Sequence, residues 1–97
     1  MNLRFLDPAE EEMLEAVRSY ESQAVGLGER FLDEVEGCMD LLLDRPYIGR
    51  RIEEFRRFPL RKFPFSLIYA LEDDDLVVVA VAHHRRRPGY WMGRYDR

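Results

Sequence analysis

Arginine, histidine and aromatic side chains concentrate in the second half of this 97-residue chain, and their chemistry suits the binding of phosphate groups. Arginine makes paired hydrogen bonds to phosphate or carboxylate, and aromatic rings stack on nucleic-acid bases. If the strands that carry these side chains are neighbours, they form one cationic surface for a nucleic acid or an acidic protein segment. Alternatively, Tyr90 and Trp91 close the hydrophobic core and the arginines are solvated. The predicted target-binding residues are Arg56, Arg57, Arg61, Lys62, His83, His84, Arg85, Arg86, Arg87, Tyr90, Trp91 and Arg94.

Charge is divided unevenly along the chain, whose net charge is −4. Residues 1–48 contain four arginines and twelve acidic residues, a net −8. Residues 49–97 contain eleven basic and seven acidic residues, a net +4. Fourteen of the fifteen basic residues are arginine. This distribution favours a nucleic-acid or acidic-protein partner for the second half.

The motifs of the common enzyme classes do not occur in the sequence, which lacks GxGxxG, a Walker sequence and Gly-x-Ser-x-Gly. His83 and His84 are adjacent at the predicted end of a strand, so they point to opposite faces and do not easily share one metal ion. Cys38 falls on the apolar stripe of a helix, where we expect a buried structural thiol. We therefore predict no metal site and no cofactor.

A short predicted strand over Leu3–Leu6 precedes a helix with Asp7 as its N-cap and Pro8 at its first position. Apolar residues then recur every three or four positions, which predicts one buried helix face. The glycines Gly26 and Gly28 end this helix. Its predicted buried residues are Ala9, Met13, Val17, Tyr20 and Ala24.

A second amphipathic helix starts near Leu27 and ends before Pro46, because the residue before a proline disfavours helical geometry. Two helices joined by a short glycine-containing turn make an antiparallel hairpin. We interpret Gly37, inside the second helix, as a point of close packing. The predicted buried residues of this helix are Phe31, Val35, Cys38, Met39 and Leu42.

From Arg50 onward the apolar period changes to two, which predicts strands. The first covers residues 57–62, and Pro59 makes it irregular or places it at an edge. The second covers residues 63–70. The third, Leu76–Ala82, is apolar on both faces and is expected in the middle of the sheet.

The order β-α-α-β-β-β predicts an α+β fold, with a helical hairpin on one face of a small antiparallel sheet. We expect a single domain over residues 1–97. The longest apolar run has seven residues, against the ~20 that a membrane helix needs. The N-terminal residues do not form a secretory signal, so the expected compartment is the cytoplasm.

Two blocks of sequence carry a resemblance to a known family. RFPLRKFPFSLIY over residues 57–69 is followed by an acidic turn and by VAVAHHRRRPGYW over residues 79–91. This pattern closely resembles RelE/ParE superfamily toxins of type II toxin–antitoxin systems, nearest to those described as plasmid stabilisation proteins. The resemblance extends to upstream residues, namely Ala16, Tyr20, Glu21, Gly28, Phe31, Arg45 and Pro46.

The resemblance implies two helices on a curved antiparallel sheet and a cognate antitoxin whose C-terminal segment wraps the toxin. We expect no membrane partner, and operator DNA would be bound only through the toxin–antitoxin complex. We expect the antitoxin to cover part of the helical face and the basic edge of the sheet. Leucines beside the apolar stripes either line a groove for it or widen the ordinary core face; they are Leu14, Leu27, Leu32, Leu41 and Leu43.

Three functions follow from the resemblance. The first is a ParE-like toxin that inhibits DNA gyrase by binding and does no chemistry of its own. The second is a RelE-like, metal-independent endonuclease that cuts mRNA on the ribosome. The third is a degenerate member that binds its antitoxin without being toxic.

In the nuclease alternative, Arg85 with Arg57 or Arg61 would stabilise the phosphate, and Tyr90 or one of the two histidines would move the proton. Nuclease members tend to have an arginine where this chain has Ser66, and a lysine near Pro59. RelE-type toxins are also usually basic, whereas this chain is acidic overall. These departures favour the gyrase hypothesis.

Overall fold

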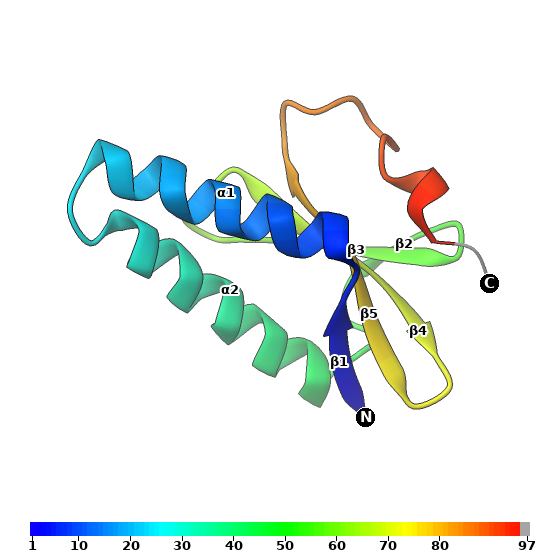
Figure 1. The fold of residues 1–97 in the computed structure, drawn as a ribbon. Coiled ribbons are helices and arrows are strands. Elements are labelled where there is room, and N and C mark those ends of the chain that lie inside the picture. The colour runs from blue at the N-terminus through cyan, green and yellow to red at the C-terminus, as the bar shows by residue number, and fades with distance from the viewer. Residues whose placement is uncertain (96–97) are drawn as a thin grey trace.

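A two-helix hairpin covers one face of a five-stranded sheet, and the segment after the last strand returns over the other face (Figure 1). The computed structural model describes residues 1–95. It confirms the predicted α+β architecture. The elements are β1 (Asn2–Phe5), α1 (Asp7–Gln23), α2 (Leu27–Asp44), β2 (Arg50–Ile52), β3 (Phe55–Pro59), β4 (Phe65–Glu72), β5 (Asp75–His83) and the 3-10 helix η1 (Met92–Arg94).

The strands lie in the order β1-β5-β4-β3-β2. The strands from β5 to β2 pair antiparallel, whereas β1 runs parallel to β5, with Leu3 opposite Leu76. The sheet is therefore mixed, because the helical hairpin leads the chain away from β1 and the β4–β5 hairpin returns it beside β1 in the same direction. As predicted, the apolar β5 lies inside the sheet, between β1 and β4.

The sequence interpretation missed β2 and extended β3 too far. β2 pairs with β3 across a two-residue turn in which Glu53 has a φ of 54°. β3 stops at Pro59, which has no N–H to continue the ladder. The prediction of a strand over residues 57–62 is therefore wrong at its end, and Arg61 and Lys62 lie in the connection to β4.

The start of α1 also differs from the prediction. Its N-cap is Leu6, and Asp7 is already the first helical residue. Leu6 stays extended and its N–H donates to the carbonyl of Val78 at 3.0 Å, which continues the β1–β5 pairing for one residue. Ala24, predicted to be buried, is exposed because the helix ends before it and Ala24 is its C-cap.

The second helix buries the predicted stripe, with Met39 only partly covered. Phe31 is its largest fully buried residue. The ring of Phe31 lies 5.3 Å from that of Tyr20, and 5.1 Å from those of Phe63 and Phe65, between centroids. We call these four rings the aromatic cluster. No helix within residues 1–95 is long and apolar enough to cross a membrane.

The two helices approach each other closely at Gly28 and not at Gly37. A Cβ on Gly28 would lie 2.6 Å from the carbonyl oxygen of Val17, whereas a Cβ on Gly37 would meet nothing within 4 Å. The Glu21 carboxylate accepts the backbone N–H groups of Gly26 and Gly28, both at 3.0 Å. The predicted role of Gly37 is therefore wrong, and the close contact belongs to the first turn of α2.

The sheet face opposite the helices has a smaller core of its own. Phe55, Ile68 and Ala80 are buried there, together with Trp91 from the segment after β5. Trp91 is 4% exposed, and the centroid of its ring lies 4.9 Å from that of Phe55. Trp91 thus closes the core of this face.

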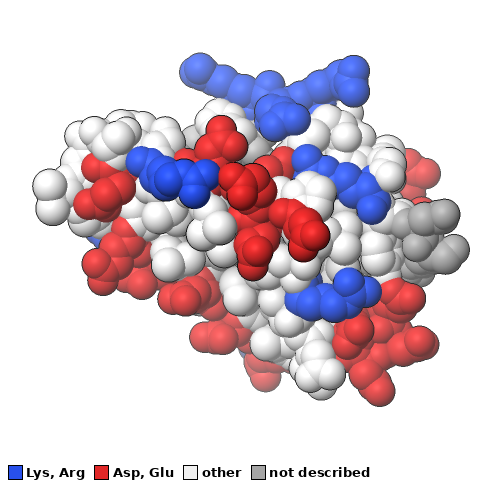
Figure 2. Space-filling view, viewed as in Figure 1, with Lys and Arg blue, Asp and Glu red and all other residues white. Residues whose placement is uncertain are grey.

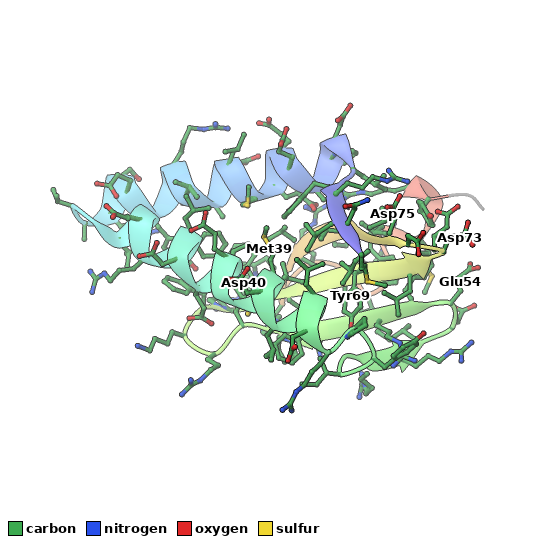
Figure 3. The ribbon with its side chains drawn as sticks, turned by 90° about the horizontal axis from the view of Figure 1, so that it is seen from below. Met39, Asp40, Glu54, Tyr69, Asp73 and Asp75 are labelled. Carbon is green, nitrogen blue, oxygen red and sulfur yellow. The ribbon has the colours of Figure 1, made fainter. Side chains whose placement is uncertain are left out.

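Tyr69 anchors the connection between α2 and β2. Figure 3 shows it on β4, beside the C-terminal end of α2. Its hydroxyl donates to the carbonyl of Pro46 at 2.8 Å and accepts the N–H of Gly49 at 3.0 Å. A Cβ on Gly49 would lie 2.6 Å from the Tyr69 oxygen, so glycine is required there. These contacts determine where β2, and with it Arg50, begins.

Candidate functional site

A cavity of about 470 Å³ lies between the sheet face opposite the helices and the segment that follows β5. Of the residues 1–95 that the structure describes, four arginines and two histidines line it, above an apolar floor, and no aspartate or glutamate does. In a chain with 19 acidic residues this composition concentrates positive potential at one place. We call it the arginine cavity; its cationic and imidazole residues are Arg50, Arg57, Arg86, Arg87, His83 and His84.

Arg57 enters this cavity because side chains alternate along β3. It is half-buried and lies opposite Arg50 of β2 and Ile68 of β4. Arg56 points to the other face. Its guanidinium donates to the carbonyls of Tyr47 and of residue 49, at 3.0 and 2.9 Å, so the predicted pair of adjacent arginines is split.

Arg61 and Lys62 lie apart from the arginine cavity, beside α2. The carboxylate of Glu34 accepts both of their backbone N–H groups, and its oxygen lies 3.1 Å from the Lys62 nitrogen. Both side chains are exposed next to Arg30 and Phe63, in a separate hollow. The structure therefore does not join them to the cluster after β5.

Ser66 and His84 meet at the wall of the arginine cavity. The Ser66 hydroxyl, only 1% exposed as a residue, lies 2.9 Å from Nε2 of His84. The β4–β5 register places Phe65 opposite His83, and the rings of this pair lie 4.9 Å apart. In the sequence, Ser66 stands out only as a position where nuclease members tend to have an arginine, because nothing local reveals its pairing with His84.

Glu12 on α1 is the centre of a second polar cluster that sequence analysis missed. Arg94 donates two hydrogen bonds to its carboxylate, both of 2.8 Å, and Tyr90 donates a third of 2.7 Å. The backbone N–H of Val81, on the β5 edge beyond β1, donates a fourth of 3.1 Å. Arg86 lies over the Tyr90 ring, 3.9 Å from its centroid. This cluster fastens the segment after β5 to the first helix.

These contacts shift the pKa values of both acidic partners. Burial alone would raise the pKa of Glu12, but the hydrogen bonds from Arg94, Tyr90 and Val81 together lower it. Burial, and then the bond to Glu12, raise the pKa of Tyr90 to about 12. Tyr90 is therefore a poor proton carrier near neutral pH, and Arg94 already has a carboxylate partner.

The sequence matches, over residues 3–88, the family described as "ParE toxin of type II toxin-antitoxin system, parDE". The chain belongs to the ParE toxin family. A solved structure described as the chromosomal ParDE TA system from P. aeruginosa has a similar fold, with a TM-score of 0.61 at 17% sequence identity. The match covers 86% of this chain and 95% of that chain. No curated protein matches the sequence.

In this ParE-family protein, Arg85 lies outside the arginine cavity. It is exposed in the turn after β5, and its backbone N–H donates to Nδ1 of His83 at 3.0 Å. The predicted set is thus divided by the fold: Arg57, His83, His84, Arg86 and Arg87 converge on the arginine cavity, where Tyr90 and Trp91 also form part of the wall. The remaining predicted residues, Arg56, Arg61, Lys62, Arg85 and Arg94, do not line it.

Figure 2 shows that positive and negative charge are separated on the surface. Basic side chains gather over the segment after β5, and acidic ones spread over the helices and around the β4–β5 turn. In Figure 3, Asp73 and Asp75 lie at the end of the sheet that carries this turn. The arginine cavity lies at the other end of β5. Within residues 1–95, no group of three His, Cys, Asp or Glu side chains could hold a metal ion.

The leucines predicted to bind the antitoxin all lie on the helical hairpin. Leu14 is 40% exposed and Leu43 37%, whereas Leu27, Leu32 and Leu41 are half-buried. The hairpin therefore keeps apolar surface in contact with solvent, outside the core that it covers.

Proposed function

We propose that this ParE-family protein is the toxin of a type II toxin–antitoxin module, inhibits DNA gyrase in the cytoplasm by binding to it, and is neutralised by a cognate antitoxin. The family match supports the toxin role. The observation that favours binding over chemistry is the state of Tyr90, whose hydroxyl is held by Glu12 and whose pKa is raised to about 12.

A nuclease of the RelE kind would need a group ready to take a proton from the 2′-hydroxyl. Tyr90 is not ready, and the expected phosphate-stabilising Arg85 is outside the arginine cavity. A binding toxin needs neither group. It needs a charged, shaped surface, and the arginine cavity supplies one.

Purified gyrase provides the direct test. With relaxed plasmid and ATP, we expect the protein to reduce supercoiling and to increase the fraction of cleaved plasmid. Addition of the cognate antitoxin before the protein should prevent both effects. Unchanged supercoiling and cleavage at a large molar excess of correctly folded protein would remove gyrase as the target.

The antitoxin part of the proposal rests on the exposed leucines of the hairpin. An amphipathic partner helix buries such side chains in a groove. We expect Leu14→Asp and Leu43→Asp to weaken antitoxin binding at least tenfold, whereas Arg18→Asp, at an exposed charged position of α1, should have little effect. Equal binding by all three variants would contradict a hairpin site.

One observation favours the mRNA endonuclease as a second candidate: the exposed imidazole of His84 stands with Arg57 in one cavity. Mapping of mRNA ends on ribosomes after induction tests it. Codon-phased cuts that His84→Gln and Arg57→Gln abolish would support the nuclease. Harmless induction in several bacterial hosts, with neither cuts nor gyrase inhibition, would instead indicate a non-toxic member.

A further inference from the structure

We propose that the arginine cavity is a binding site for a nucleoside phosphate, with the phosphate on its arginines and the base against its apolar floor. The shared ligand chemistry is a phosphorylated nucleoside, supplied either by a free nucleotide or by a nucleic-acid strand. Such a site would bind its ligand whether or not the protein acts on gyrase.

The first support is unbalanced charge. Arg50, Arg57 and Arg87 line the cavity, and within the described part of the chain none of them lies within 4.0 Å of a carboxylate oxygen. Arg57 is also half-buried, so part of its hydration is lost without compensation from an acidic partner. A bound anion would restore that compensation, and guanidinium groups hold phosphate oxygens through paired hydrogen bonds.

The contrast with Arg86 and Arg94 strengthens this point. Both lie near Glu12: Arg94 pairs with its carboxylate at 2.8 Å and Arg86 stands 4.0 Å from it. Glu12 therefore provides the counter-charge for Arg94 and, at the limit of an ion pair, for Arg86. It does not line the arginine cavity, so Arg50, Arg57 and Arg87 there have no such counter-charge.

The second support is the floor. Ile52, Ile68 and Ala82 present apolar surface from three different strands, and Trp91 closes one side. A flat apolar surface next to cationic groups suits a nucleobase, which has two apolar faces and is joined to its phosphate by a sugar. The cavity volume, about 470 Å³, is within the range of roughly 300–1,000 Å³ that small-molecule sites occupy.

The third support is the buried Ser66 hydroxyl. Its hydrogen bond to Nε2 holds the imidazole of His84 at the wall of the cavity, and it is the reason that a hydroxyl can be tolerated at a position 1% exposed. The imidazole adds a hydrogen-bonding group beside the arginines. A carboxylate-bearing peptide would use the arginines alone, one charge at a time, whereas a phosphate brings two charges to one point.

Trp91 is the only tryptophan of the chain and lies in the cavity wall, so its fluorescence reports on the site directly. The full-length protein is titrated with adenosine 5′-monophosphate, adenosine, inorganic phosphate, a 5′-phosphorylated single-stranded DNA and hexaglutamate. We expect adenosine 5′-monophosphate to bind at least tenfold more tightly than adenosine or inorganic phosphate alone. If the DNA binds more strongly than the monophosphate, and its affinity falls steeply with salt, the natural ligand is a nucleic-acid strand. If the monophosphate binds more strongly, the natural ligand is a free nucleotide.

Two adjacent arginines of β2 provide the matched variants. Arg50 lines the cavity, whereas Arg51 faces the other way and donates to the carbonyl of Glu53 at 2.8 Å. We expect Arg57→Gln and Arg50→Gln each to weaken nucleotide binding about tenfold or more, and Arg51→Gln to change it less than twofold. If Arg57→Gln lowers the melting temperature, the binding of nucleotide by Arg50→Gln is the deciding measurement, because Arg50 is exposed.

Three results would overturn the site. The first is no binding of either the monophosphate or the DNA at millimolar concentration. The second is an equal loss of binding in Arg50→Gln and Arg51→Gln, which would mean that only net charge matters. The third is tighter binding of hexaglutamate than of the monophosphate, which would make this face a surface for acidic peptides. Each result is independent of gyrase inhibition, which is measured separately.

Discussion

The two faces of the sheet are closed in opposite ways. The helix side is closed by apolar packing, in which the aromatic cluster joins both helices to the β3–β4 connection and to β4. The other side is closed by the segment after β5, which is held by one buried ring, Trp91, and by the polar bonds that converge on Glu12. The aromatic cluster on the helix side contains no charged side chain, whereas charged side chains make most of the contacts that hold the segment after β5.

This difference separates stability from recognition. Hydrophobic burial is large and does not depend on geometry in detail, so the helix side carries most of the folding free energy. Polar clusters contribute less in net terms but fix orientation, because each donor must meet its acceptor. The side held by Glu12 is therefore suited to keep arginines in place around a cavity, and the helix side to keep the sheet folded.

The largest expected effect is on the helix side. Phe31→Ala removes the ring in contact with the other three of the aromatic cluster and should lower the free energy of unfolding by about 3–5 kcal/mol. Urea denaturation followed by circular dichroism measures this. The control, Leu14→Ala, truncates a side chain that is 40% exposed and should cost less than about 1 kcal/mol. Similar losses in both variants would break the comparison.

A smaller effect is expected at Glu12. Glu12→Ala leaves Arg94, Tyr90 and the N–H of Val81 without their acceptor and should cost about 2–3 kcal/mol. Hydrogen exchange should show faster exchange of the Val81 amide. Glu11→Ala is the control, because Glu11 pairs with Arg18 at the surface and should contribute at most about 0.5 kcal/mol. If the two variants lose equal stability, Glu12 does not fasten the segment.

Much of the fold could be predicted because its signals are local. The helical hairpin, its break near Gly26 and the interior position of β5 follow from periodicity and from glycine and proline positions. The errors arose where a distant contact decides. Gly28 and Gly37 lie in the same helix, and only the approach of Val17 in α1 shows which one is packed. Leu6, not Asp7, caps α1 because β5 holds its N–H.

The kinds of residue in the candidate site could be predicted from the sequence, but not which individual residues belong to it. The arginines and histidines after β5 were found because they cluster in the sequence. Arg50 was missed because β2 is too short for a period-two signal, and Ser66 because its partner His84 lies 18 residues away, just after the end of β5. Glu12 is one of three consecutive acids in the first turns of α1, and its role depends on Arg94, 82 residues away.

The smallest expected effect is on the pH dependence of the unfolding free energy, and it tests the bond between Tyr90 and Glu12. The pKa of Tyr90 is about 12 in the folded protein, against an ordinary value of 10, because of burial and of its bond to Glu12. A raised pKa contributes stability below pH 10, and this contribution is lost as pH rises from 10 to 12, because the unfolded chain ionises first. The wild type should therefore exceed Tyr90→Phe in unfolding free energy at pH 9, by about 1 kcal/mol, and this difference should shrink by pH 11.

The same comparison in a Glu12→Gln background tests the cause. With the carboxylate gone, the pH dependence should be weaker, since burial remains but the acceptor charge does not. Chemical denaturation at pH 9, 10 and 11 measures all four proteins. A difference that stays constant over this range, or an identical pH dependence in both backgrounds, would mean that the Tyr90 hydroxyl is not held by Glu12. The segment after β5 would then be held by Trp91 and by the bonds between Arg94 and Glu12, without a contribution from the Tyr90 hydroxyl.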